Sequence, residues 1–257
     1  MTTTDNFLLT LQAFQELQAE LRQPDDPALA ETVLPAVTDG ALPDGSLLLG
    51  LAEDGLPLLL DLYDPAPGPL LVAGDGGCGK TALLQSLARA SDLNNPGEIQ
   101  FGVLTPFPEE WEGYETLPNC LGVWPAYHQA GRDFLAQLVD WSAALPNTRQ
   151  AVLLFVDGLD LLVASDFQAR HNLRWLLVHG PQRQVWPIVT VNPERLEQMQ
   201  TWLDYFTTRI FGQVTRFEVA RQLVDNPRVD LAAIYPGRQF GLFQPGSWLK
   251  FWLPPFD

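Results

Sequence analysis

Residues 74–81 read GDGGCGKT, and this stretch constrains the fold of the chain more than any other. It satisfies the pattern G-x-x-x-x-G-K-[ST], in which glycines let successive backbone N–H groups turn toward one anion. The apolar run LLVAG at 70–74 precedes the pattern and ALLQSLARA follows it, as expected for a strand, a loop and a helix. A glycine-rich turn that matches by chance would not have these flanking elements. The stretch therefore predicts a phosphate-binding loop.

The loop residues that we expect to bind a nucleotide are Gly74, Asp75, Gly76, Gly77, Cys78, Gly79, Lys80 and Thr81. The helix that begins there adds unpaired N–H groups and the positive end of its dipole. Lys80 is expected to reach the β and γ phosphates of ATP, and the Thr81 hydroxyl to take one site on Mg²⁺. Cys78 has two interpretations: a small residue that the loop tolerates, or a thiolate stabilised at the helix N-terminus.

Apolar strands alternate with helical segments along most of the chain. Strands are expected at 70–74, 99–105, 151–157, 185–191 and 209–214, and helices at about 80–90, 131–144, 166–179 and 194–205. This alternation predicts an α/β, three-layer P-loop fold with a mainly parallel central sheet. Because a strand at 99–105 falls between the loop and the next acidic motif, the order suggests the RecA-like class with an additional strand.

The ends of the chain have a different pattern. Residues 5–22 are apolar at helical spacing, and residues 23–45 contain four prolines and many acids. We therefore expect an amphipathic helix with an acidic linker over residues 1–45, and a P-loop domain over 46–257. The helix would dock on the body of the chain or on a partner. Peripheral β-hairpins are expected at 46–63 and at 239–255.

The second motif is Asp157, which follows the apolar run AVLLFV. Its carboxylate would complete a Mg²⁺ site with Thr81. The additional-strand class generally places a glutamate directly after this aspartate to orient or deprotonate the attacking water, and Gly158 stands there instead. Asp160 is the candidate substitute; its alternative is a solvated or helix-capping residue. Nucleotide binding is thus better supported by the sequence than hydrolysis.

With these residues, the chain resembles the FtsK/HerA superfamily of ATPases. The resemblance rests on GLPLLLDLYDPAPGPLLVAGDGGCGKT, on WPIVTVNPE and on TTRIFGQV, and it spans about 47–255. It implies a RecA-like fold, ATP with Mg²⁺, a polar sensor at Asn192, and frequently a hexameric ring. In such a ring an arginine reaches the neighbour's γ-phosphate; Arg209 or Arg216 would be that residue, ahead of Arg195, and the alternative for each is a surface arginine.

The segment VDGLDLL also resembles the second motif of NACHT-type signalling ATPases, hhhhDGLDE, although Leu161 replaces its final acid. Two functions therefore stay open. The first is an ATPase of FtsK/HerA type that couples hydrolysis to conformational change or translocation. The second is a nucleotide-binding switch or adaptor that hydrolyses little, because Gly158 replaces the glutamate.

The net charge limits the partners. Fifteen Lys and Arg stand against 31 Asp and Glu, a formal charge of −16, which disfavours broad contact with DNA or anionic membranes. No apolar run approaches the length of a membrane helix, and the start of the chain lacks the pattern of a signal peptide. With two cysteines, the composition favours a cytoplasmic protein.

Overall fold

A computed structural model describes residues 42–144, 149–224, 226 and 229–254. The helix expected at 5–22 and most of the linker expected at 23–45 lie outside the described residues. The first described strand begins at Ser46. No helix in the described part of the chain is both long enough and apolar enough to cross a membrane.

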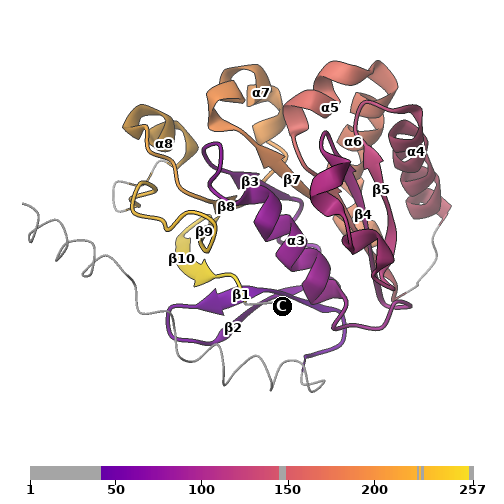
Figure 1. The fold of residues 1–257 in the computed structure, drawn as a ribbon, viewed down its shortest axis with the longest axis horizontal. Helices are drawn as coiled ribbons and strands as arrows, with labels where there is room; N and C mark the ends of the chain where they lie inside the picture. Colours follow the sequence, from indigo (N-terminus) through magenta and orange to yellow (C-terminus); the bar gives the residue numbers. More distant parts are fainter. Residues whose placement is uncertain (1–41, 145–148, 225, 227–228, 255–257) are drawn as a thin grey trace, which may run out of the picture.

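The described strands form one ten-stranded sheet with the order β2-β1-β10-β9-β8-β3-β7-β6-β4-β5 (Figure 1). Their bounds are β1 Ser46–Ala52, β2 Pro57–Asp61, β3 Leu70–Ala73, β4 Ile99–Thr105, β5 Cys120–Pro125, β6 Ala151–Val156, β7 Val185–Val191, β8 Thr208–Phe211, β9 Gln239–Gln244 and β10 Ser247–Trp252. The strands from β8 to β5 are parallel, and the remaining pairs are antiparallel. The α/β fold with a mainly parallel sheet is confirmed. The two expected hairpins are present, and they continue the central sheet beyond β8.

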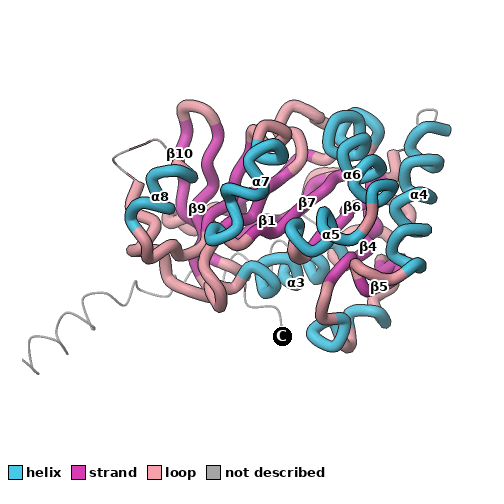
Figure 2. Tube along the Cα trace, turned by 90° about the horizontal axis from the view of Figure 1, so that it is seen from above, coloured by secondary structure: helices cyan, strands magenta, loops and turns pink. Residues whose placement is uncertain are grey.

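Helices cover both faces of this sheet (Figure 2). The α-helices of the described residues are α3 Lys80–Ser91, α4 Gln129–Ala144, α5 Leu159–Ser165, α6 Phe167–His179, α7 Leu196–Leu203 and α8 Phe217–Leu223. The 3₁₀ helices are η2 Pro108–Trp111, η3 Tyr114–Thr116, η4 Pro181–Arg183 and η5 Pro193–Arg195. Each of the four helices predicted from the sequence has a counterpart, whereas the short helices α5 and α8 were not predicted.

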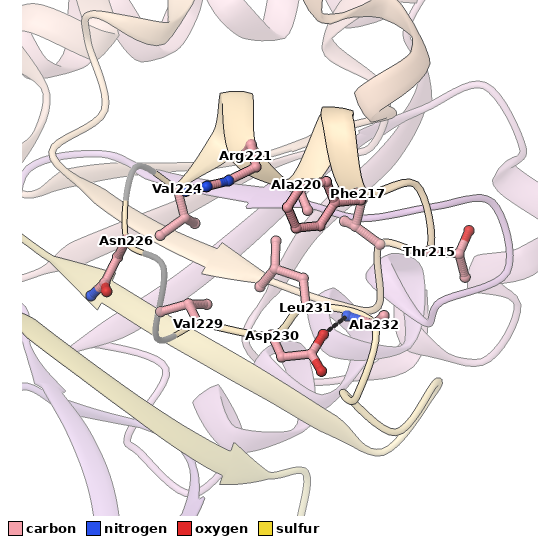
Figure 3. A pocket seen from close by; sticks show the side chains of 11 residues that line it. Thr215, Phe217, Ala220, Arg221, Val224, Asn226, Val229, Asp230, Leu231 and Ala232 are labelled. Atoms are coloured by element: carbon pink, nitrogen blue, oxygen red, sulfur yellow. Dashed lines mark hydrogen bonds between the residues drawn. The ribbon is translucent and has the colours of Figure 1, made fainter.

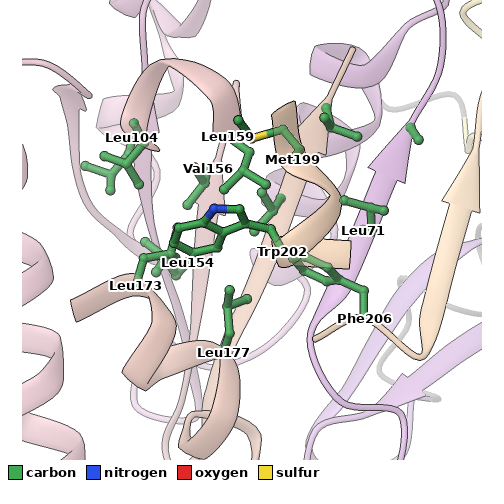
Figure 4. Packing of buried hydrophobic residues seen from close by; sticks show 14 of the residues in the cluster. Leu71, Leu104, Leu154, Val156, Leu159, Leu173, Leu177, Met199, Trp202 and Phe206 are labelled. Atoms are coloured by element: carbon green, nitrogen blue, oxygen red, sulfur yellow. The ribbon is translucent and has the colours of Figure 1, made fainter. Parts of the chain in front are cut away.

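Two hydrophobic clusters fill the space between the layers, because successive strand residues point to opposite faces. Leu70 of β3 belongs to the same cluster as the buried leucines of α3, and Leu71 belongs to the cluster that contains the buried apolar residues of α6 and α7. On the second face, Trp202 of α7 lies between Leu154 of β6 and Leu177 of α6 (Figure 4). Each fully buried side chain of this size contributes about 1.5–3 kcal/mol. The two clusters thus hold β3 and β6 firmly between helices.

The additional strand of the sheet is β7, which lies between β3 and β6. The sequence order had pointed to the strand at 99–105 for this place, and that assignment was wrong. This strand, β4, pairs with β6 and β5 on the far side of β6. After α3 the chain forms β4 three positions away from β3, and β6 and β7 later occupy the two positions between them. The order of strands along the chain therefore did not predict their order in the sheet.

The strand expected at 209–214 ends at Phe211. Beyond it, the backbone leaves the ladder: the Gln213 carbonyl accepts a bond from the Asp75 N–H (2.9 Å), and the Val214 N–H donates to the Leu231 carbonyl (3.1 Å). The segment after β8 is therefore tied to the loop at 74–81.

Candidate nucleotide-binding site

The loop at 74–81 leaves β3 and enters α3 at the carboxyl edge of the parallel strands. Gly77 and Gly79 have φ angles of +76° and +97°, which L side chains rarely adopt. A Cβ on Gly79 would also lie 2.6 Å from the Cα of Gly237. The glycine at position 79 is thus required twice, by its backbone conformation and by the chain packed against it.

Unpaired donors gather in this loop. Within the described part of the chain, no protein acceptor takes the backbone N–H groups of Gly76, Gly77, Gly79 and Thr81. A Cβ at position 76 or 77 would meet nothing within 4 Å, so the space beside these two residues is open. Several N–H groups at the start of a helix form an anion-binding site.

Lys80 bridges the loop. Its ammonium group donates to the carbonyl oxygens of Gly74 (2.7 Å) and Asp75 (2.9 Å). These two bonds hold the ammonium group against the loop backbone, and its third N–H can donate to a phosphate oxygen.

The two motifs meet at the carboxylate of Asp157, which is 7% exposed. The Thr81 hydroxyl donates to one carboxylate oxygen, and the Thr190 hydroxyl donates to the other, each at 2.8 Å. The Thr190 oxygen in turn accepts the N–H of Gly158 at 2.8 Å. A hydroxyl from α3 and a carboxylate after β6 are oxygen donors of the kind that Mg²⁺ uses together with phosphates. The donor set therefore fits a magnesium ion.

Thr190 was not among the residues predicted for the site. It is the polar residue in the otherwise apolar strand VWPIVTV, one position before the strand ends, and this exception was the signal available. Asn192, the predicted sensor, has another contact: its side-chain oxygen accepts the N–H of Glu194 at 3.1 Å and caps η5. Thr190 of β7 contacts Asp157, whereas Asn192, which follows β7, caps η5.

Gly158 and Asp160 follow Asp157 in a tight turn. Gly158 is the N-cap of α5 with a φ of +101°. Asp160 lies in the first turn of α5 and forms an ion pair with Arg195; the two side chains are 10% and 51% exposed. Asp160, the candidate substitute for the missing glutamate, is thus paired with Arg195, which is one of the three candidate arginines.

Comparison with protein families matches residues 68–226 to the NACHT domain, a stretch that holds the loop and Asp157 and covers more than half of the chain. The chain belongs to the NACHT family. NACHT domains are P-loop NTPase domains, and the NACHT-like spacing of Asp157 and Asp160 in VDGLDLL is explained by this membership. A search of curated proteins gave no significant match in sequence.

Solved structures share the fold of this NACHT domain at low sequence identity. Thermomonospora curvata EccC, a type VII secretion ATPase, matches as its cytoplasmic domain with a TM-score of 0.63, 16% identity, and coverage of 85% of this chain and 27% of that chain. ATPases 2 and 3 of the same EccC, in complex with a signal sequence peptide, match with a TM-score of 0.66, 16% identity, and coverage of 85% and 42%. VirB4 of Thermoanaerobacter pseudethanolicus matches with a TM-score of 0.54, 10% identity, and coverage of 84% and 98%.

The NACHT domain therefore spans less than half the length of the EccC chains that it matches. The fold expected from the resemblance to FtsK/HerA-type ATPases is confirmed by these neighbours.

Arg209 of the NACHT domain is half-buried, and its guanidinium donates to the carbonyl oxygens of Phe206 (3.1 Å), Leu203 (3.3 Å) and Leu223 (3.4 Å). It stands opposite Leu71, three residues before the loop begins. Burial lowers the pKa of Arg209, and the charge of Asp204 opposes this effect. The side chain is held by its own chain, whereas Arg216, at the start of α8, is exposed.

Cys78 packs as a small apolar residue. Its side chain is 2% exposed, and its Sγ lies so close to Gly74 and Gly212 that a Cβ on either would approach it to 2.4 and 2.6 Å. Burial raises the pKa of the Cys78 thiol, which opposes thiolate formation. The first of its two interpretations therefore fits the structure, and the thiolate does not.

A cavity of about 380 Å³ lies beside the loop on the β8 side (Figure 3). Thr215 connects the two, because its N–H and its hydroxyl both donate to the Asp75 carboxylate at 2.8 Å. Apolar side chains form most of the lining, whose residues are Val214, Thr215, Phe217, Ala220, Arg221, Val224, Asn226, Val229, Asp230, Leu231 and Ala232.

Proposed function

We propose that this NACHT domain binds ATP with Mg²⁺ and hydrolyses the nucleotide to drive a conformational change. The observation that carries the proposal is the 2.8 Å hydrogen bond between Thr81 and Asp157, beside a loop of unpaired N–H groups. The bond brings a residue of the loop and a residue 76 positions later to one point. A Gly-rich turn without a nucleotide has no need of this arrangement.

Each part of the site has a task in this proposal. The loop N–H groups and the Lys80 ammonium bind the phosphates, and Thr81 and Asp157 hold the metal. Mg²⁺ neutralises charge on the β and γ phosphates when it is bound. Thr190 fixes the orientation of the Asp157 carboxylate, because its hydroxyl donates to the oxygen that Thr81 does not contact. The carboxylate therefore keeps its orientation when Thr81 turns to the ion.

A specific observation favours a second function, a nucleotide-dependent switch that hydrolyses little. The position after Asp157 carries no side chain, since Gly158 turns the chain into α5 with a φ of +101°. A glutamate in this conformation would be strained by roughly 1–3 kcal/mol. General-base help is worth about 10²–10⁴-fold in rate. Without another base, the domain would bind ATP and retain it.

Steady-state phosphate release and nucleotide affinity, measured on wild type and on Lys80→Ala, test the proposal. Wild type should bind ATP with Mg²⁺ and release phosphate, and Lys80→Ala should lose at least about tenfold in affinity as a charge-assisted contact disappears. If wild type binds ATP but releases phosphate no faster than Lys80→Ala does, hydrolysis is refuted and the nucleotide-dependent switch remains. Absence of binding in wild type would refute both functions.

A further inference from the structure

The turn after β6 leaves the site without an acid at the usual place. Gly158 has no side chain, and Asp160 is paired with Arg195. A carboxylate that acts on water must therefore come from another element at the same edge of the sheet. β4 is the next strand along this edge, since the Asp157 N–H donates to the Leu104 carbonyl at 2.8 Å.

The segment after β4 turns toward the site. Pro106 lies close to Gly158, because a Cβ on Gly158 would lie 3.9 Å from the Pro106 Cδ. The Phe107 N–H donates to the Thr105 hydroxyl at 3.2 Å, and the Glu110 N–H donates to the Phe107 carbonyl at 3.1 Å. These bonds shape η2, which carries Glu110 at its third position.

Two contacts fix η2 beside the nucleotide site. Trp111 is fully buried and stacks on Phe155, two residues before Asp157, with ring centroids 6.1 Å apart. The Gln85 side-chain amide donates to the backbone carbonyl of Glu110 at 2.6 Å. Gln85 follows Thr81 by one helical turn, so both residues lie on one face of α3. Glu110 is thus held between β6 and the helix that carries Thr81.

The charges agree with this placement. Partial desolvation and the carboxylate of Asp157 raise the pKa of Glu110, and Glu109 adds a smaller effect in the same direction. Glu110 itself is exposed to solvent. A water molecule can reach it from outside.

We propose that Glu110 is the residue that orients and deprotonates the water attacking ATP in this domain. In the step, the water oxygen forms a bond to the γ-phosphorus, and the bond from that phosphorus to the β,γ-bridging oxygen breaks. One water proton passes to the Glu110 carboxylate, and the products are ADP and inorganic phosphate. The inference rests on the proposed function.

The experiment compares Glu110→Gln with Glu109→Gln, which removes the same charge from the preceding residue of η2. Glu110→Gln should lower the rate of ATP hydrolysis by about 10²-fold or more, while Glu109→Gln stays within about threefold of wild type. The affinity for ATPγS with Mg²⁺ and the melting temperature should be unchanged in both variants. Retention of ADP with aluminium fluoride, which requires a positioned water, should fall in Glu110→Gln alone.

The outcomes separate this inference from the function beneath it. If Glu110→Gln hydrolyses ATP within about threefold of wild type, or if both variants fall equally, Glu110 is not the base. If wild type binds ATPγS but hydrolyses ATP no faster than Lys80→Ala, the inference is refuted and nucleotide binding stands. If wild type binds no nucleotide, the proposed function is refuted together with the inference.

Discussion

At the scale of single residues, Asp157 is the group on which the site depends. Its buried carboxylate accepts hydrogen bonds from Thr81 and Thr190, so it is partnered before any ion arrives. A buried carboxylate without such partners would be costly. The residue therefore has a structural as well as a proposed metal-binding role.

Thr190→Val should lower the stability of the fold through its effect on Asp157. The change keeps the shape but removes a donor to Asp157 and the acceptor for the Gly158 N–H. We expect the free energy of unfolding to fall by about 1–3 kcal/mol in urea titrations. Thr190→Ser keeps the hydroxyl and serves as the control. Equal stability of the Val and Ser variants would show that these bonds contribute little.

At the scale of elements, Arg209 of β8 connects several parts of the fold. The guanidinium ties this strand to the carbonyl of Leu203 in α7 and to that of Leu223 in α8. The resemblance to ring-forming ATPases had suggested that the same side chain reaches a neighbouring subunit. In the structure its contacts connect a strand with two helices, and its action on a neighbouring subunit stays a prediction.

Arg209→Ala should therefore lower stability, by about 2 kcal/mol or more in urea titrations, since three carbonyls lose a charged donor. Arg216→Ala is the matched control at an exposed site and should change stability by less than about 0.5 kcal/mol. Unchanged stability of Arg209→Ala, combined with lost ATP hydrolysis, would instead favour action on a nucleotide.

Elements differ in how well the sequence predicted them, for physical reasons. The central strands β3, β4, β6 and β7 are nearly continuous apolar runs, because both of their faces are covered. β5 was missed, since it is a half-exposed edge strand that contains Gly122 and ends at Pro125. α5 and α8 have seven residues each, too few for a clear periodicity.

At the scale of the whole molecule, the formal charge of −16 disfavours broad, nonspecific binding to phosphate backbones. Phosphate backbones bind proteins through clustered Lys and Arg, and these number 15 against 31 acids here. The fold neighbours share the architecture at 10–16% identity, which does not carry a substrate over to this chain.

The full chain should therefore pass through immobilised duplex DNA at about 50 mM salt, with or without ATP and Mg²⁺. A basic DNA-binding protein on the same column is the control. Retention at low salt that disappears as salt is raised would contradict this expectation and would favour translocation on DNA.

The sequence by itself determined the loop at 74–81, the acid at 157 and the α/β class, because these depend on contiguous residues and on the local period of apolar side chains. Only the tertiary structure decided which distant residues meet Asp157 and its neighbours. Thr190 reaches Asp157 because β7 is inserted beside β6, and η2, which carries Glu110, lies next to β6 because Trp111 stacks on Phe155. The whole core sets strand order and side-chain packing, and the spacing of residues in a motif predicts neither of them.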